Sequence, residues 1–165
     1  MSRTSLPGKP VRESVSEYFE IALPNDANPL GNLLGGRVMH LVDLCGALAA
    51  ARHSRQPVVT ASVDHMTFLH PVHIGDLVVL RSTVNRVFST SMEIGVKVWV
   101  ENLRTGVVRH TSSAYLTFVA LNKEGKPTAI PPVIPETEEE VRRFDEAGAR
   151  RTYRLAMKER TREDV

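Results

Sequence analysis

Residues with the types and spacing of a reactive site are concentrated between positions 28 and 43. Asn28 stands in a loop, Gly35 and Gly36 form a Gly-Gly step where a helical pattern begins, and Asp43 is the one acid in the apolar stretch that follows. An ionised carboxylate in hydrocarbon surroundings is very costly unless a partner stabilises it. The position of Asp43 therefore requires a structural or a chemical reason.

Acyl transfer is the chemistry that these residue types would support. Amides at the start of a helix, unshielded by side chains at Gly35 and Gly36, could polarise a carbonyl and hold an oxyanion. Asp43 could take a proton from water or attack directly, and Asn28 could orient the water or the substrate. In the structural alternative Asp43 caps a neighbouring backbone, Asn28 is a turn residue, and the glycines only allow tight packing.

Helix geometry separates the two halves of this site. Asp43 comes seven residues after Gly36, so a rise of about 1.5 Å per residue places it roughly 10 Å further along the helix axis. One carbonyl can hardly touch both groups in a single chain. A second protomer whose helix packs alongside would supply the missing group, which predicts a site shared between two protomers.

The elements that position these residues follow from hydrophobic periodicity. Residues 37–53 are apolar or small nearly all round, which predicts a buried helix. Alternating or apolar runs predict strands at 16–22, 58–69, 77–88, 92–101 and 107–121. The short connections favour antiparallel neighbours. The pattern predicts an α+β fold, with one long central helix wrapped by an antiparallel sheet of about five or six strands.

Length and composition indicate a single domain. The chain has 165 residues, of which 42% are hydrophobic and 24% charged, enough for one core. We expect a flexible arm over residues 1–13, the domain itself over 14–131, and a charged C-terminal extension over 132–165 that forms a peripheral or frayed helix.

Several classes of protein are disfavoured by the same sequence. A formal net charge of +2 is too balanced to indicate a nucleic-acid or membrane partner. The absence of a signal-peptide pattern and of an apolar run of about 18 residues favours a cytoplasmic location. Cys45, the single cysteine, is expected in the core, and no H-E-x-x-H or paired-cysteine motif indicates a metal. No G-x-S-x-G or phosphate-binding glycine loop is present.

Two segments, ANPLGNLLGGRVMHLVDLCGALAA and VVTASVDHMTFLHPVHIGD, resemble the acyl-CoA thioesterases of the hotdog-fold superfamily, particularly the cytosolic long-chain acyl-CoA hydrolases and their bacterial relatives. The likeness covers about residues 15–131, and the loop Asn, the Gly-Gly step and the helix acid match Asn28, Gly35, Gly36 and Asp43. It implies hydrolysis of an acyl-CoA thioester to a free acid and CoA, with no cofactor besides the CoA of the substrate. It also implies that Asn28 and Asp43 meet from different protomers, in a homodimer at least and in a trimer of dimers as the larger assembly.

A CoA substrate would bring phosphate groups, which arginine and lysine bind well. His70 stands where many relatives have an arginine before the Pro-Val step. Arg86, Ser89, Thr90 and Lys97, on or beside the adjacent strands, are the further candidates for CoA binding.

Two other functions on the same fold stay open. A non-catalytic acyl-CoA sensor that regulates lipid genes would need a DNA-binding module, for which residues 1–14 are too short, although the charged tail could bind a protein partner. The second is dehydration or hydration of a hydroxyacyl chain; relatives of that type pair a catalytic histidine with the acid, and the loop before Gly35 contains no histidine.

Overall fold

A single helix, α1 (Gly35–Ser54), lies at the centre of the fold. The computed structural model describes residues 6–163. The buried side of α1 consists mainly of small and branched apolar residues, among them Val38, Leu41, Val42, Cys45 and Ala49. The helix ends where Arg55 adopts a left-handed conformation (φ 54°) and its amide donates to the Ala51 carbonyl at 2.8 Å.

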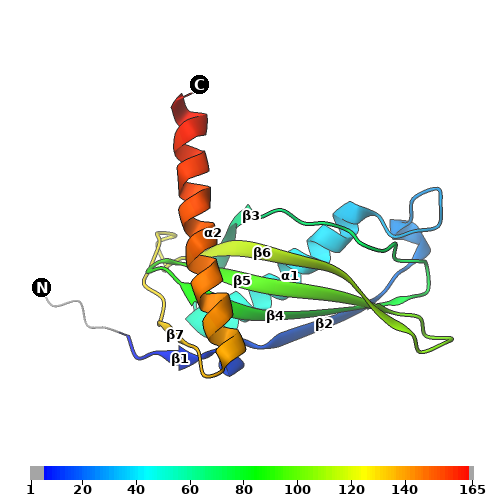
Figure 1. The fold of residues 1–165 in the computed structure, drawn as a ribbon, viewed down its shortest axis with the longest axis horizontal. Helices are drawn as coiled ribbons and strands as arrows, with labels where there is room; N and C mark the ends of the chain where they lie inside the picture. The colour runs from blue at the N-terminus through cyan, green and yellow to red at the C-terminus, as the bar shows by residue number, and fades with distance from the viewer. Residues whose placement is uncertain (1–5, 164–165) are drawn as a thin grey trace, which may run out of the picture.

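Five antiparallel strands curl around one side of this helix in the order β2-β4-β5-β6-β3 (Figure 1). They span Ser16–Ile21 (β2), Val58–Val63 (β3), Leu77–Val87 (β4), Ser91–Glu101 (β5) and Val108–Ala120 (β6). Successive side chains of a strand point to opposite faces, so Val96 of β5 packs towards α1 and Glu93 towards the other face. The predicted α+β arrangement, a long central helix wrapped by an antiparallel sheet, is confirmed.

β3 is shorter than the sequence pattern predicts. The expected strand over 58–69 ends at Val63, after which the chain leaves regular structure. The amides of Asp64 and Leu69 still donate to the Tyr115 and Thr111 carbonyls of β6, each at 2.9 Å. Because β3 is an edge strand, it has no second neighbour to keep the segment extended.

The N-terminal segment differs from the expected flexible arm over 1–13. Residues 1–5 lie outside the described residues, whereas Lys9–Pro10 (β1) pairs in parallel with Val133–Ile134 (β7), and Val11–Ser14 forms a 3-10 helix, η1. The buried Ser14 hydroxyl donates to the Val11 carbonyl at 2.7 Å and accepts from the Val84 amide at 3.0 Å. This segment therefore belongs to the folded domain, because it pairs with β7 and is hydrogen-bonded to β4 of the main sheet.

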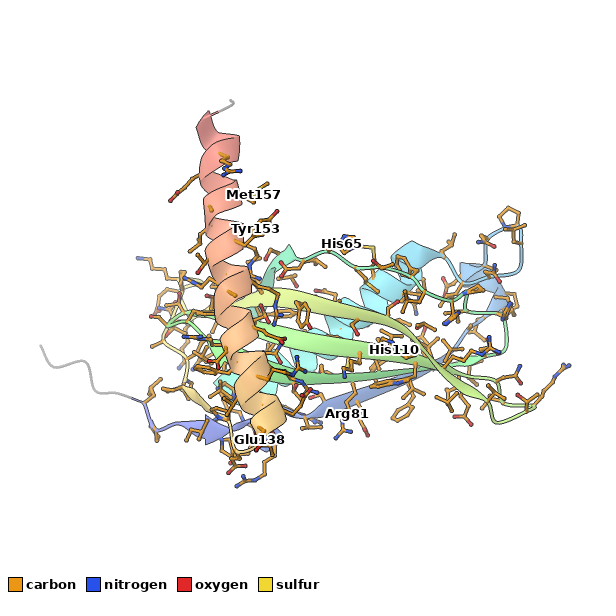
Figure 2. All side chains as sticks on the ribbon, in the orientation of Figure 1. His65, Arg81, His110, Glu138, Tyr153 and Met157 are labelled. Atoms are coloured by element: carbon orange, nitrogen blue, oxygen red, sulfur yellow. The ribbon has the colours of Figure 1, made fainter. Side chains whose placement is uncertain are left out.

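The C-terminal extension forms a 26-residue helix, α2 (Glu138–Glu163), that crosses the sheet on the face opposite α1 and projects beyond it (Figure 1 and Figure 2). The sequence predicted a peripheral or frayed helix. Val141 and Leu155 of α2 are exposed, whereas Ala147 is fully buried. Within residues 6–163, no helix is long and apolar enough to cross a membrane.

Arginines hold α2 against the sheet. Glu93 of β5 has no exposed side-chain surface, and both of its oxygens accept hydrogen bonds from Arg150 of α2, at 2.7 to 3.2 Å. Asn85 and Arg154 donate to the same carboxylate, at 3.1 and 3.3 Å. Burial lowers the pKa of Arg150, but the hydrogen bonds and charge of Glu93 outweigh burial and raise it, so the guanidinium stays charged.

Stacking of guanidinium groups on aromatic rings completes this contact. Arg150 lies 3.6 Å from the centre of the Tyr115 ring, and Arg151 lies 4.5 Å from that of Phe88. On the sheet, Arg86 lies 4.2 Å from the Phe144 ring of α2. A helix rich in charge thus packs closely on a sheet, because long arginine stems and planar guanidinium groups cover apolar rings.

The contact between α1 and the sheet generates a stability prediction. A Cβ atom at Gly46 would lie 3.0 Å from the Phe118 ring, which is buried between helix and sheet. We expect Gly46→Leu to lower the free energy of unfolding by about 1–3 kcal/mol, because the larger side chain overpacks the core. Urea denaturation measures the change. Ala51→Leu, at an exposed position of the same helix, is the control and should change it by less than about 0.5 kcal/mol; equal effects would contradict this packing.

Candidate active site

The loop before α1 holds Asn28 in a tight turn. The Asn28 amide donates to the Asn32 carbonyl at 2.7 Å, and its side-chain Oδ1 accepts from the Leu30 and Asn32 amides at 3.0 and 3.1 Å. Gly31 adopts a positive φ of 79° at the tip, which a side chain would disfavour. Asn28 therefore is a turn residue, but the turn uses only its side-chain oxygen. The Asn28 side-chain NH₂ has no partner among residues 6–163.

The start of α1 is fixed by ion pairs of Arg37 to Glu20 of β2 and to Asp26, the latter at 3.2 Å. The Leu34 amide also donates to the Asp26 carbonyl at 2.8 Å. The amides of Gly35 and Gly36 precede the internal hydrogen bonds of the helix and have no acceptor among the described residues. Both glycines are exposed and a Cβ at Gly36 would meet nothing within 4 Å, so these amides are open to an incoming carbonyl.

Asp43 accepts a hydrogen bond from a residue that the sequence did not indicate. The Thr60 hydroxyl of β3 donates to Asp43 Oδ1 at 2.6 Å. The register of β3 shifts between Thr60 and Ser62, a bulge that leaves Ala61 unpaired with β6. Bulges reorient neighbouring side chains. The sequence offers no signal for this partner, because Thr60 and Asp43 are 17 positions apart and lie in different elements.

Exposed apolar side chains lie on or next to α1, the helix that carries Asp43, and on the segment beside it, residues 59–69. Their exposed fractions lie between 37% and 57%, and they comprise Leu34, Met39, Leu44, Leu48, Val59, Val63, Phe68 and Leu69. The prediction that α1 is buried all round is therefore wrong for the single chain, where one side of the helix is uncovered. Exposed apolar surface of this extent is typical of an interface or a ligand site.

The candidate CoA-binding residues do not gather in one place. Ser89 and Thr90 form the turn between β4 and β5, whereas His70 lies near the start of α1, in the loop whose His73 bridges to Asn32. β4 has 11 residues, which at about 3.3 Å per residue separates its two ends by roughly 30 Å. The expected set thus divides between opposite ends of the sheet.

The other two CoA candidates, Arg86 and Lys97, differ in what surrounds them. Arg86 donates to the Phe144 carbonyl at 3.3 Å and stacks on the Phe144 ring, so it packs α2 instead of lying free for a phosphate. Lys97 is exposed in a cleft of about 630 Å³ between the sheet and the start of α2, and His70 lines a second cleft of about 370 Å³ beside Arg109. Neither cleft includes Gly36 or Asp43.

The matches to known proteins fall on this helix and its neighbours. A sequence profile of the thioesterase superfamily matches residues 30–107, which include Gly35, Gly36, Asp43 and Thr60. An uncharacterized acyl-CoA thioester hydrolase of Bacillus subtilis, YkhA, is 43% identical over 135 residues, which cover 82% of this chain and 78% of that protein. The chain belongs to the acyl-CoA thioester hydrolase family.

Solved structures of hotdog-fold acyl-CoA hydrolases have the same architecture as this family member. A hexameric acyl-CoA thioesterase in its apo form is 38% identical, with a TM-score of 0.88, over 92% of this chain and 97% of that one. The acyl-CoA hydrolase of Staphylococcus aureus, solved with butyryl-CoA, CoA and CoA disulfide, is 32% identical, with a TM-score of 0.88, over 96% of each chain.

The one thiol of this hydrolase-family chain is a core group, as the sequence predicted. Cys45 is free and fully buried, 3.4 Å from the Ser82 hydroxyl, and burial raises the pKa of the thiol. A protonated, shielded thiol is a poor nucleophile. Within residues 6–163, no group of His, Cys, Asp and Glu is arranged to hold a metal ion.

This burial predicts low thiol reactivity. In the native protein at pH 8, Cys45 should react with an aromatic disulfide reagent at least about 10²-fold more slowly than in urea, because both access and thiolate formation are suppressed. Release of the coloured thiol measures both rates. Equal rates in the two conditions would show that the thiol is accessible.

Proposed function

We propose that the protein hydrolyses acyl-CoA thioesters to free acids and CoA at a site shared by two protomers. The observation that carries the proposal is the Thr60 hydroxyl donating to the Asp43 carboxylate at 2.6 Å, on an apolar surface of the helix that begins with the open amides of Gly35 and Gly36. Family membership and the CoA-bound structure of the Staphylococcus aureus hydrolase support this substrate class.

The reaction assigns a task to each residue. The Gly36 amide, assisted by Gly35, donates to the thioester carbonyl oxygen and stabilises the negative charge that develops there. Asp43 removes a proton from water as the water oxygen bonds to the carbonyl carbon. Thr60 holds the carboxylate in orientation, and the Asn28 NH₂ orients the water or the acyl group. The carbon–sulfur bond then breaks, and the proton passes from Asp43 to the leaving sulfur of CoA.

Sharing between protomers follows from distance and exposure. Gly36 and Asp43 are separated by roughly 10 Å along one helix, too far for a single carbonyl and its attacking water. If the α1 helices of two protomers pack together, Asp43 of each faces the Gly36 amide of the other, and the apolar residues around Asp43 become buried. The hexameric relative supports a larger assembly, a trimer of such dimers. The cytoplasmic location and the lack of a further cofactor stay predictions.

Substitution of the carboxylate and of its hydroxyl partner tests the chemistry. Asp43→Asn should lower kcat on a medium-chain or long-chain acyl-CoA at least about 10²-fold, because the general base is lost. Thr60→Val should lower it about tenfold through loss of a hydrogen bond to a charged group, whereas Thr60→Ser should retain activity. Release of free CoA measures turnover, and gel filtration shows that assembly is intact.

Two outcomes of this experiment would contradict the proposal. Normal turnover by a correctly assembled Asp43→Asn protein would exclude Asp43 as the base. Tight binding of acyl-CoA by the unmodified protein without any release of CoA would instead favour the non-catalytic acyl-CoA sensor.

Complementation between inactive variants tests the shared site. An Asn28→Ala protein and an Asp43→Ala protein, each inactive alone, are co-expressed with different affinity tags. A mixed dimer has one site in which both residues are intact, so a random mixture should recover about a quarter of the unmodified activity. Asp43→Ala co-expressed with Asp43→Asn is the control and should recover none. If the first mixture also recovers none, the site lies within one chain.

A further inference from the structure

Asp64 occupies a central position on the segment that borders the candidate site. Four residues before it, Thr60 donates to Asp43 at 2.6 Å, and four residues after it, the Phe68 ring lies 3.5 Å from where a Cβ at Gly35 would stand. One short segment, residues 60–68, therefore contacts both the base and the start of the helix that offers the open amides.

The backbone of this segment has few constraints. β3 is an edge strand with a bulge at Ala61, and regular structure ends at Val63. The Asp64 amide donates to the Tyr115 carbonyl at 2.9 Å. The next backbone bond from this segment to β6 is that of Leu69. Edge strands that end in an irregular segment open easily, so the position of Thr60 needs a further restraint.

The side chain of Asp64 is bound from α2. Arg154 Nη1 lies 2.7 Å from Asp64 Oδ2, and the two side chains are only 20% and 17% exposed. The same nitrogen lies 3.3 Å from Glu93 Oε2, within the contact that docks α2 on the sheet. Charged hydrogen bonds that are shielded from solvent are stronger and more directional than exposed ones.

We propose that Arg154 is a positioning residue for thioester hydrolysis. By binding the Asp64 carboxylate it fixes the segment 60–68 against the docked helix, so that the Thr60 hydroxyl stays aligned with Asp43 on the opposite side of the sheet edge. The inference rests on the proposed function, because alignment of Asp43 matters only if Asp43 takes part in the reaction. It gives the charged C-terminal helix a role in catalysis although α2 lies on the face away from α1.

Arg150 allows this role to be separated from simple docking. Arg150 makes three hydrogen bonds to the fully buried Glu93, whereas Arg154 makes one to Glu93 and one to Asp64. If Arg154 served only to dock α2, removal of Arg150 should be the more harmful change in every respect. If Arg154 positions the segment 60–68, stability and turnover should respond in opposite order.

The experiment compares Arg150→Met, Arg154→Met and Arg142→Met in the full chain. Arg142 carries exposed ion pairs to Glu139 and Glu146 within α2 and is the matched control. We expect Arg150→Met to lower the thermal midpoint most, because it leaves the Glu93 charge poorly compensated. We expect Arg154→Met to lower kcat roughly tenfold, with KM changed less than about twofold, because small misplacements of reacting groups reduce turnover. Arg142→Met should change neither quantity.

A conservative substitution and a double variant test the positioning role of Arg154 more specifically. Arg154→Lys keeps a cation near Asp64 and should restore most of the lost kcat. In a Thr60→Val background, Arg154→Met should produce no further decrease in kcat, since both changes act through the alignment of Asp43. Independent tenfold losses that multiply, or an Arg150→Met protein with the lower kcat, would overturn the proposal.

Hydrogen exchange provides a readout that does not depend on activity. The amides of residues 60–64 should exchange faster in Arg154→Met than in the unmodified and Arg142→Met proteins. Unchanged exchange would overturn the restraint on the segment. A lack of acyl-CoA hydrolysis by the unmodified protein would instead reject the proposed function, and the exchange result would still show whether Arg154 holds the segment.

Discussion

An ionised carboxylate on an apolar helix is stable only where hydrogen-bond donors reach it, and the Thr60 hydroxyl reaches Asp43 in this chain. This contact constrains much of the fold. It joins α1 to β3, which lies at the edge of the sheet, and it coincides with a bulge in that strand. The contact therefore ties an edge strand, which has a single strand neighbour, to the helix.

The two faces of the sheet pack against their helices through different kinds of contact. The face towards α1 is filled by branched and aromatic apolar residues, and Gly46 lets the helix approach Phe118 closely. The opposite face buries Glu93, which is tolerated because two arginines and an asparagine neutralise and solvate it. A helix of low hydrophobicity can therefore dock there, with arginine stems and aromatic rings taking the place of an apolar stripe.

The exposed apolar residues on and next to α1 and β3 support the proposed pairing of two protomers. They lie on or next to α1 and β3, the two elements that meet at the Asp43–Thr60 contact, and are therefore not scattered over the surface. Both described clefts lie away from Asp43, which agrees with a substrate site that one chain leaves incomplete. Pairing of α1 helices would cover this surface and bring each carboxylate towards open amides that its own chain cannot supply.

Local patterns in the sequence determined the elements and the candidate residues. Helical and alternating periodicity placed α1 and the long strands within a few residues, and the loop, the Gly-Gly step and the lone acid marked Asn28, Gly35, Gly36 and Asp43. These features are local, since they depend on residues that are near neighbours along the chain. The spacing of Gly36 and Asp43 was likewise fixed by helix geometry alone.

Only the tertiary structure decided which distant residues meet. Thr60 binds Asp43, residues 9–14 join the domain instead of forming an arm, and α2 docks through contacts between residues 57 to 90 positions apart. Among the CoA candidates, His70 lies at the opposite end of the sheet from Ser89 and Thr90, and Arg86 stacks on the Phe144 ring. Such contacts depend on strand order, register and side-chain geometry, which no local pattern encodes.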